Sequence, residues 1–337
     1  MTHSARLLSG FLCLSVVLTA MSTTQADDQW ITYEGGEGPG KGKHIVFVSG
    51  DDEYRSEEAC PQLAKILSLH HGFKCTVLFA IDDKGEINPA HQTNIPGTHF
   101  LNDADMMVVF LRFRHLPDEQ MKPIDDFTKS GKPMMGLRTA THSFNYRNMD
   151  SPYAKWHWRS KEPQGGWGQA VLGDTWISHH GHHKKEATRG VVEQANANHP
   201  ILTGVGDVFG LTDVYGIVHL RDDDAILMRG SVLTGMKPTD PPVEGKKNNP
   251  MMPLVWTRMY KGEAGKTSRV VSTTMGASVD LESEGLRRLL VNGCFWGLQM
   301  DVPEKAKVDI VGEFKPTMYG FGTFQKGLKP SDFALRK

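Results

Sequence analysis

The chain has 337 residues, and its 38 basic and 39 acidic side chains leave a formal charge of −1 at pH 7. This balance gives no reason to expect nucleic acid or an anionic membrane surface as a partner. The chain is long enough to bury a full core, and four cysteines are too few for a disulfide framework. Cys60, Cys75 and Cys294 are therefore interpreted as small buried hydrophobes, with a single bridge left open.

Residues 1–26 have the pattern of a secretory signal peptide. Arg6 precedes a stretch of apolar and small residues that ends at Ala20, and small residues stand at the expected cleavage position before Ala26. The stretch is too short for a convincing membrane span, which needs about 20 predominantly apolar residues, although a retained amino-terminal anchor is the alternative. The mature protein is predicted to be exported, periplasmic or extracellular, and free of the membrane.

Residues 27–42 are polar and rich in glycine, which predicts a flexible lead-in. Short apolar runs then predict four buried strands, at residues 44–50, 74–80, 105–111 and 133–137. Between them, one helix is expected after Ser56 and another within residues 116–133. This alternation predicts an α/β fold with three layers, a doubly wound and mostly parallel sheet of the flavodoxin-like kind.

The second half of the chain has less regular patterning. Candidate strands lie at residues 189–195, 225–230, 252–260 and 268–275. A loop at 234–250, rich in proline, glycine and lysine, predicts an exposed insertion, and a last helix is expected from Leu281. One domain is predicted for residues 43–299, and the tail at 300–337 is expected to pack on it.

Polar loops follow three of the predicted strands, at the sheet edge where such folds bind ligands. The candidate catalytic residues there are Asp52, Glu53 and His142, and the candidate substrate-binding residues are Tyr54, Arg112, Arg114 and Arg138. Paired guanidiniums suit a carboxylate, a phosphate or a row of sugar hydroxyls, and ion pairs with the neighbouring acids are the alternative. The turn after the fourth strand has no cysteine, which argues against glutamine hydrolysis.

Tryptophans are interleaved with glycines in "YAKWHWRSKEPQGGWGQ", at residues 153–169. Aromatic rings near a cleft stack on the apolar faces of sugars, so Trp158 is a candidate substrate-binding residue. The alternative is a small satellite core.

The stretch "WISHHGHHKKE", residues 176–186, holds four histidines around one glycine. On a helix His179 and His183 would share a face, but Gly181 disfavours a helix. In an extended segment His180 and His182 point the same way, so this pair is favoured for catalysis or as two ligands of a divalent metal. A third ligand would come from Asp51, Asp52 or His142, and the alternative is an exposed turn without function.

Several blocks together, among them "HIVFVSGDDEYRSEE", "DADMMVVFLRFRHLPDEQM", "SGKPMMGLRTATHSF", "GHH" and "HPILTGV", resemble the ThuA-like (trehalose utilisation) family in its exported subgroup. The resemblance implies a fold like that of class I glutamine amidotransferases without the catalytic cysteine, and a link to disaccharide catabolism. It also implies a polar rim at Asp52, Glu53, Tyr54, Arg138, His142, His180, His182 and Asp213 to Tyr215, with Tyr215 as a substrate-binding candidate. Ala277 departs from the family, because many members have a histidine there.

These observations lead to the hypothesis of an exported enzyme that acts on a carbohydrate by hydrolytic or eliminative cleavage of a keto-glycoside. A histidine of the cluster would be the general base, and either a divalent metal or Arg114 and Arg138 would polarise the carbonyl. The alternative is a non-catalytic sugar- or metal-binding module. Whether the chain forms a homo-oligomer is left open.

Overall fold

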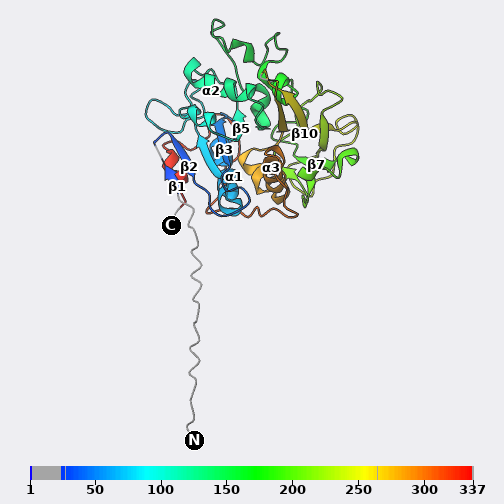
Figure 1. Cartoon of the computed structure of the whole chain (residues 1–337). Helices are drawn as coiled ribbons and strands as arrows, with labels where there is room; N and C mark the ends of the chain where they lie inside the picture. The colour runs from blue at the N-terminus through cyan, green and yellow to red at the C-terminus, as the bar shows by residue number, and fades with distance from the viewer. Residues whose placement is uncertain (2–23, 27, 264, 336–337) are drawn as a thin grey trace.

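The structure is a computed structural model that describes Met1 and residues 24–26, 28–263 and 265–335 (Figure 1). The signal peptide predicted for residues 1–26 lies almost entirely outside these residues. Among the described helices, none combines the length and the hydropathy that a segment crossing a bilayer requires.

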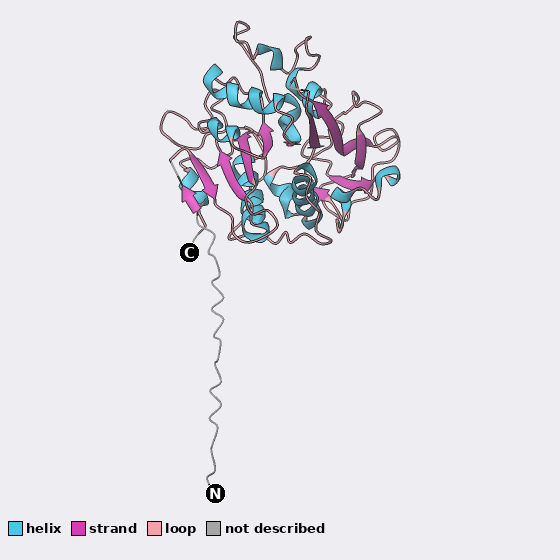
Figure 2. Cartoon of the chain, in the orientation of Figure 1, coloured by secondary structure: helices cyan, strands magenta, loops and turns pink. Residues whose placement is uncertain are grey.

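A single mixed sheet of eleven described strands, in the order β1-β2-β4-β3-β5-β6-β11-β10-β9-β7-β8, runs through the molecule (Figure 2). Its centre, from β4 to β11, is parallel, and the flanking strands pair antiparallel. The strands are β1 (Thr24–Ala26), β2 (Trp30–Tyr33), β3 (His44–Gly50), β4 (Lys74–Leu78), β5 (Met106–Leu111), β6 (Met134–Leu137), β7 (Thr188–Val192), β8 (Phe209–Gly210), β9 (Ala225–Val232), β10 (Met252–Lys261) and β11 (Thr267–Thr273).

Helices cover both faces of the sheet, as the alternating sequence pattern predicts. They are α1 (Ser56–His71), α2 (Asp118–Lys129) and α3 (Glu284–Gly297). On strand β3, Ile45 and Phe47 pack in the core of α1 and α3, whereas Val46 and Val48 pack in the core of α2. The predicted three-layer α/β architecture is confirmed, with α2 above and α1 and α3 below the sheet in the view of Figure 1.

The prediction of a flexible lead-in at residues 27–42 is wrong for its first part. Strand β2 pairs antiparallel with β4, and its Ile31 and Tyr33 side chains are fully buried. The glycines that follow are held by close packing, because a Cβ on Gly35 would lie 2.5 Å from the carbonyl oxygen of Gly72. Glycine content alone indicated flexibility here, although it marks a close approach of two backbones.

The later predictions are confirmed with shifted ends. All four candidate strands of the second half form, as β7, β9, β10 and β11. The last helix begins at Glu284, three residues after the expected start, because the Ser283 hydroxyl accepts a hydrogen bond from the backbone nitrogen of Leu286. The three cysteines of the described chain are buried and free.

After α3 the chain runs along the face of α3 and α1 towards the other edge of the sheet (Figure 1). The carbonyl oxygens of Ala306 and Val308 accept hydrogen bonds from arginines of α3, and that of Lys307 contacts His71 at the end of α1. Near the end, the carbonyl oxygen of Phe333 accepts a hydrogen bond from the Tyr33 hydroxyl of β2. Residues 317–324, between these points, lie beside the candidate site and are called the tail strap below.

Candidate functional site

The loop between β3 and α1 is folded around the buried carboxylate of Asp51. This carboxylate accepts hydrogen bonds from the backbone nitrogens of Glu53 and Tyr54 and from the Thr139 hydroxyl. Burial raises the pKa of Asp51 to about 6, and these hydrogen bonds act in the opposite direction. Asp51 therefore shapes the loop and leaves Glu53 to face the site.

Arg112, directly after β5, is the cation of this edge. Its Nη1 donates to Asp52 at 2.9 Å, and its Nε lies 3.8 Å from Glu53. The guanidinium lies between two aromatic rings, 4.6 Å from the centroid of Phe113 and 4.7 Å from that of Phe321 in the tail strap. Burial lowers the pKa of Arg112, but the neighbouring carboxylates outweigh it and raise this pKa above the ordinary value.

His142 follows β6, in the short turn Arg138–His142. Its ring is buried, and Nδ1 lies 3.1 Å from the Thr141 hydroxyl. Burial, together with the positive charges of Arg112 and Arg138, holds the pKa of His142 well below its ordinary value. The imidazole is therefore neutral at physiological pH.

His179 and His183 converge on Asp213, a carboxylate with no exposed surface. His179 Nδ1 donates to Asp213 Oδ2 at 2.6 Å, and His183 Nδ1 donates to Oδ1 at 3.1 Å. Burial alone would raise the pKa of Asp213, but hydrogen bonds from both histidines and the charge of Arg138 hold it far below the ordinary value. Asp213 is thus a permanent anion that orients both rings.

His183 connects two acids. Its second nitrogen, Nε2, lies 3.1 Å from Glu53, so the ring bridges Glu53 and Asp213. Hydrogen bonds to these two carboxylates raise the pKa of His183 to about 9. His183 is accordingly an imidazolium at neutral pH, whereas His179 uses one nitrogen for Asp213 and keeps the other for the cavity.

Arg138 supports this arrangement from beneath. The fully buried guanidinium lies between the rings of Tyr54 and Tyr215, 4.0 and 4.3 Å from their centroids. It donates to the carbonyl oxygens of Asp213 and Thr274 and, at 3.3 Å, to the Asp213 carboxylate. Arg138 therefore fixes the position of the carboxylate that orients the histidines.

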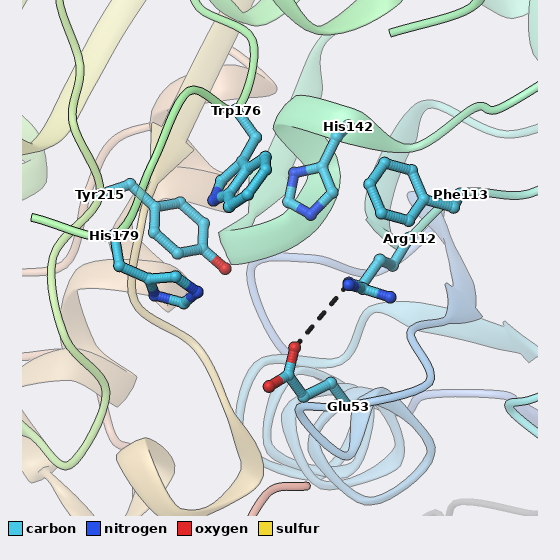
Figure 3. A pocket seen from close by; sticks show the side chains of 7 residues that line it. All are labelled: Glu53, Arg112, Phe113, His142, Trp176, His179 and Tyr215. Atoms are coloured by element: carbon cyan, nitrogen blue, oxygen red, sulfur yellow. Dashed lines mark ion pairs between the residues drawn. The ribbon is translucent and has the colours of Figure 1, made fainter. Parts of the chain in front are cut away.

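A small cavity of about 20 Å³ lies between these groups (Figure 3). Its lining residues are Glu53, Arg112, Phe113, His142, Trp176, His179 and Tyr215. Glu53, Arg112 and His142 come from the loops after β3, β5 and β6, which is the edge that the sequence predicted. Figure 3 shows the free nitrogen of His179 pointing into the cavity and the Arg112 guanidinium across from it.

The structure brings together many of the residues that the sequence singled out. Glu53, Arg112, His142 and Tyr215 line the cavity, and Asp52 lies behind Arg112. Tyr54 is not among the lining residues, and its ring lies against Arg138 and edge-on to His183. Trp158 lies in a neighbouring groove, where its ring contacts those of Phe113 and Trp176.

The favoured pair His180 and His182 does not reach the cavity, which corrects the prediction of these residues as catalytic or metal ligands. His180 Nε2 bonds the carbonyl oxygen of Lys247, and His182 is exposed. His179 forms an isolated β-bridge with Tyr215, and the chain then turns, with the backbone nitrogens of Lys185 and Glu186 bonded to the carbonyl oxygen of His182. The turn returns His183 to the face of His179 without a helix.

Arg114 and Arg138 also differ from the prediction that they bind substrate. Arg114 is fully buried and donates to the carbonyl oxygens of Pro89, His91 and Arg112. Burial lowers its pKa to about 10. Both guanidiniums are used inside the protein, and Arg112 is the one that faces the cavity.

Sequence reasoning missed His179, His183, Phe113 and Trp176 as site residues. The spacing of the two histidines was the available signal, since a tight turn brings residues four apart together as a helix does. Asp213 had been placed on the rim by the resemblance alone.

Within the described residues, three side chains of this site also form a group that could hold a metal ion. His179, His183 and Asp213 each offer a ligand atom, and these atoms lie within 4.8 Å of one another. Two imidazoles and a carboxylate suit a zinc-like ion that keeps one open position. His183 donates the proton on Nδ1 to Asp213 and the proton on Nε2 to Glu53, and an ion bound by this ring would have to displace one of the two. The donor set therefore fits a divalent metal at the cost of that hydrogen bond.

Comparison with known proteins shows that this chain is similar to several solved structures. A protein described as ThuA-like from Bacteroides uniformis shows 14% identity and a TM-score of 0.46, with 79% of this chain and 94% of that chain covered. Another from Parabacteroides merdae shows 14% identity and a TM-score of 0.47, over 83% and 98% of the two chains. The CTPS glutaminase domain of Trypanosoma brucei shows 11% identity and a TM-score of 0.35, over 79% and 98%. No family model matches the chain, and no curated protein matches it.

Two of these solved structures thus bear the family name that the sequence blocks suggested. Identities of this size do not carry a reaction from those proteins to this chain.

Proposed function

We propose that this chain is a ThuA-like enzyme that cleaves the glycosidic bond of a keto sugar, with His179 as general base. The observation that carries the proposal is the 2.6 Å hydrogen bond between His179 Nδ1 and Asp213, which leaves the other ring nitrogen as a proton acceptor inside the cavity. A carboxylate behind a histidine fixes the tautomer and stabilises the imidazolium that forms when the base takes a proton.

The proposed chemistry needs only groups of this cavity. A keto group acidifies the neighbouring carbon–hydrogen bond, and His179 removes that proton. The electron pair forms a double bond as the bond to the glycosidic oxygen breaks, and the protonated His179 gives its proton to this oxygen. Water then adds its hydroxyl group and a proton across the double bond. Arg112 faces His179 across the cavity and stabilises the negative charge that develops on the keto oxygen.

The remaining lining groups suit a sugar. Glu53 offers carboxylate oxygens that accept hydrogen bonds from hydroxyl groups, and the neutral His142 donates or accepts without adding charge. Trp176 and Tyr215 present flat rings on the same cavity. This mixture of carboxylate, cation and aromatic faces supports a carbohydrate over an apolar ligand.

Purified mature protein, incubated with 3-keto disaccharides with and without added divalent metals, tests the reaction. We expect release of a monosaccharide together with deuterium incorporation beside the keto carbon when the reaction runs in D2O. Wild type that neither releases sugar nor exchanges this hydrogen would remove the proposed chemistry. The matched variants His179→Ala and His180→Ala should differ, since only the first lacks the base.

A non-catalytic metal-binding role is the second candidate, favoured by the cluster of His179, His183 and Asp213. Elemental analysis of the purified protein decides it. One bound divalent ion per chain that is lost in His183→Ala, in a protein inactive on every keto sugar tested, would support the binding module. An ion present in an active protein would instead assign the carbonyl polarisation to the metal.

We also propose export to the periplasm or the cell exterior, on the pattern of residues 1–26 alone. Amino-terminal sequencing of the protein recovered after expression with its full leader gives the answer. Cleavage after Ala26 supports export, and an intact amino terminus in the cytosolic fraction speaks against it.

A further inference from the structure

The cavity of the candidate site is too small for the ligand that the proposed function requires. Its volume of about 20 Å³ has room for roughly one water molecule or one small functional group. A sugar ring can enter only if a wall of the cavity moves. The wall formed by Glu53 and Arg112 is the one that the tail strap contacts.

The tail strap, residues 317–324, holds both charged residues of this wall. The backbone nitrogen of Gly320 donates to the carbonyl oxygen of Glu53 at 2.8 Å. The ring of Phe321 lies 4.7 Å from the guanidinium of Arg112. Displacing the strap would therefore release the backbone at Glu53 and uncover one face of Arg112, so that this wall of the cavity can move.

The strap belongs to a part of the chain with little regular structure. Residues 298–329 contain no helix and no strand. Within the strap only Tyr319 and Gly320 are buried, and Phe321 is 57% exposed. Thr317 and Tyr319 also make hydrogen bonds to the body of the protein. A segment with so few buried side chains is of the kind that opens locally while the rest of the fold stays intact.

Arg55, buried below the strap, has hydrogen-bond acceptors on one side only. Its Nη2 donates to the carbonyl oxygen of Gly320 at 2.6 Å and to the hydroxyl of Thr323. Its Nε and Nη1 have no acceptor among the described residues, although the side chain has no exposed surface. The backbone of Arg55 is left-handed, with a φ of 63°, which is uncommon for a residue other than glycine and is often found in switch regions.

A second acceptor for Arg55 lies close by. The Glu57 side chain is 4% exposed, and neither carboxylate oxygen accepts a hydrogen bond from another described residue. Its Oε1 lies 3.9 Å from Arg55 Nη1, so a movement of about 1 Å would bring the two atoms to the usual hydrogen-bond distance of about 2.9 Å. Burial raises the pKa of Glu57 to about 8, and the charge of Arg55 acts in the opposite direction. Arg55 thus has two alternative sets of partners, the strap and Glu57.

We propose that the tail strap is a lid on the candidate site and that Arg55 is its latch, which exchanges Gly320 and Thr323 for Glu57 when the strap lifts. The structure is the closed state. The pair with Glu57 replaces the hydrogen bonds that the guanidinium loses, so opening leaves no buried charge without a partner. This inference rests on the proposed function only for the size of the ligand that has to enter.

Hydrogen exchange of the full chain, resolved at the Gly320 amide by mass spectrometry, measures how often the lid opens. Glu57→Gln withdraws the charge that receives Arg55 in the open state, so this amide should exchange about three- to tenfold more slowly. Thr323→Ala removes one of the two acceptors of the closed state, so the amide should exchange about three- to tenfold faster. The controls Glu119→Gln and Met318→Ala, at exposed positions, should leave the rate within about twofold of wild type.

Labelling of histidines with diethyl pyrocarbonate tests whether the strap controls access to the cavity. The reagent is much larger than a water molecule, so it reaches the buried ring of His142 only in an open state. Labelling of His142, followed by peptide mass spectrometry, should be faster in Thr323→Ala and slower in Glu57→Gln. The exposed His182 is the internal control and should be labelled at the same rate in every variant.

These outcomes separate the lid from the proposed reaction. Opposite shifts of exchange and labelling in the two variants support the lid. Exchange at Gly320 that is unchanged in both variants, or faster in Glu57→Gln with an unchanged melting temperature, overturns the latch. Exchange that shifts without any change at His142 overturns the control of access. Neither measurement uses a sugar, so the lid can fail in an enzyme that cleaves keto sugars and can stand in a protein that does not. Thr323 is exposed, so its variant tests the lid even if Glu57→Gln does not fold.

Discussion

The Nδ1 atom of His179 and the Oδ2 atom of Asp213 lie 2.6 Å apart, although 34 positions separate the two residues in the chain. The buried carboxylate decides which nitrogen of the ring remains free to act as a base. We expect His179→Ala to lower kcat by about a hundredfold or more, and Asp213→Asn to lower it similarly because the amide no longer selects this tautomer. Steady-state kinetics on a keto-disaccharide provide the measurement.

The same histidine stretch supplies matched controls for that experiment. His180→Ala and His182→Ala change the same type of residue one position from His179 and His183, yet neither side chain lines the cavity. Both should keep kcat within about threefold of wild type. A large loss in either one, with an unchanged melting temperature, would contradict the assignment of His179.

We expect the buried guanidinium of Arg138 to stabilise the folded protein. Arg138→Met removes the cation that lies between Tyr54 and Tyr215 and leaves the Asp213 carboxylate buried with less compensation. Breaking a buried ion pair from one side costs about 3–5 kcal/mol, so we expect a loss of that order in the free energy of unfolding. Urea denaturation followed by circular dichroism measures it, with the exposed Arg147→Met as the control.

The bridge made by His183 predicts how stability depends on pH. Its folded pKa of about 9 lies above the ordinary value, so its contribution is complete below about pH 6.5 and is lost as the pH rises through 9. Allowing for a ring that is 28% exposed, the loss should be about 1–2 kcal/mol between pH 6.5 and 9.5. His183→Gln, compared with wild type after treatment with a chelator, should lack this part of the pH slope.

The tail strap should affect substrate binding through Arg112. Phe321 is 57% exposed, and its ring covers one face of the guanidinium that lines the cavity. Phe321→Ala removes a cation–π contact of about 0.5–1 kcal/mol and frees Arg112 to move, so KM should rise roughly two- to fivefold with little change in kcat. Met318→Ala, an exposed position in the same strap, controls for a general loosening of the tail.

Local pattern was enough to predict the centre of the sheet. Strands β3 and β5 are buried on both faces and therefore appear in the sequence as continuous apolar runs, and the polar loops after them had to meet at one edge. This is why Glu53, Arg112 and His142 were expected together and are found together. Strand β2 was missed because it has only four residues and lies directly before a glycine-rich segment.

The roles of the histidines and arginines depend on partners that are distant in the chain. The backbone nitrogen of His182, at the start of the turn, donates to the carboxylate of Glu186, which also pairs with Lys247. The turn therefore depends on a distant loop, and no pattern in the neighbouring sequence indicates this contact. Arg114 and Arg138 follow predicted strands just as Arg112 does. The carbonyl oxygens that accept hydrogen bonds from their buried guanidiniums, however, come from other parts of the chain. Residue type indicated a cation, and only the tertiary structure shows which cation faces the cavity.

The contacts of the tail strap also bear on the order in which the protein matures. Gly320 donates its backbone N–H to the carbonyl oxygen of Glu53, and the ring of Tyr319 lies against those of Tyr54 and His183. Nearly 270 residues of translation separate Glu53 from these partners, so a nascent chain can build the whole parallel sheet before its site is assembled. Catalytic competence should therefore appear only after synthesis of this chain has passed the strap.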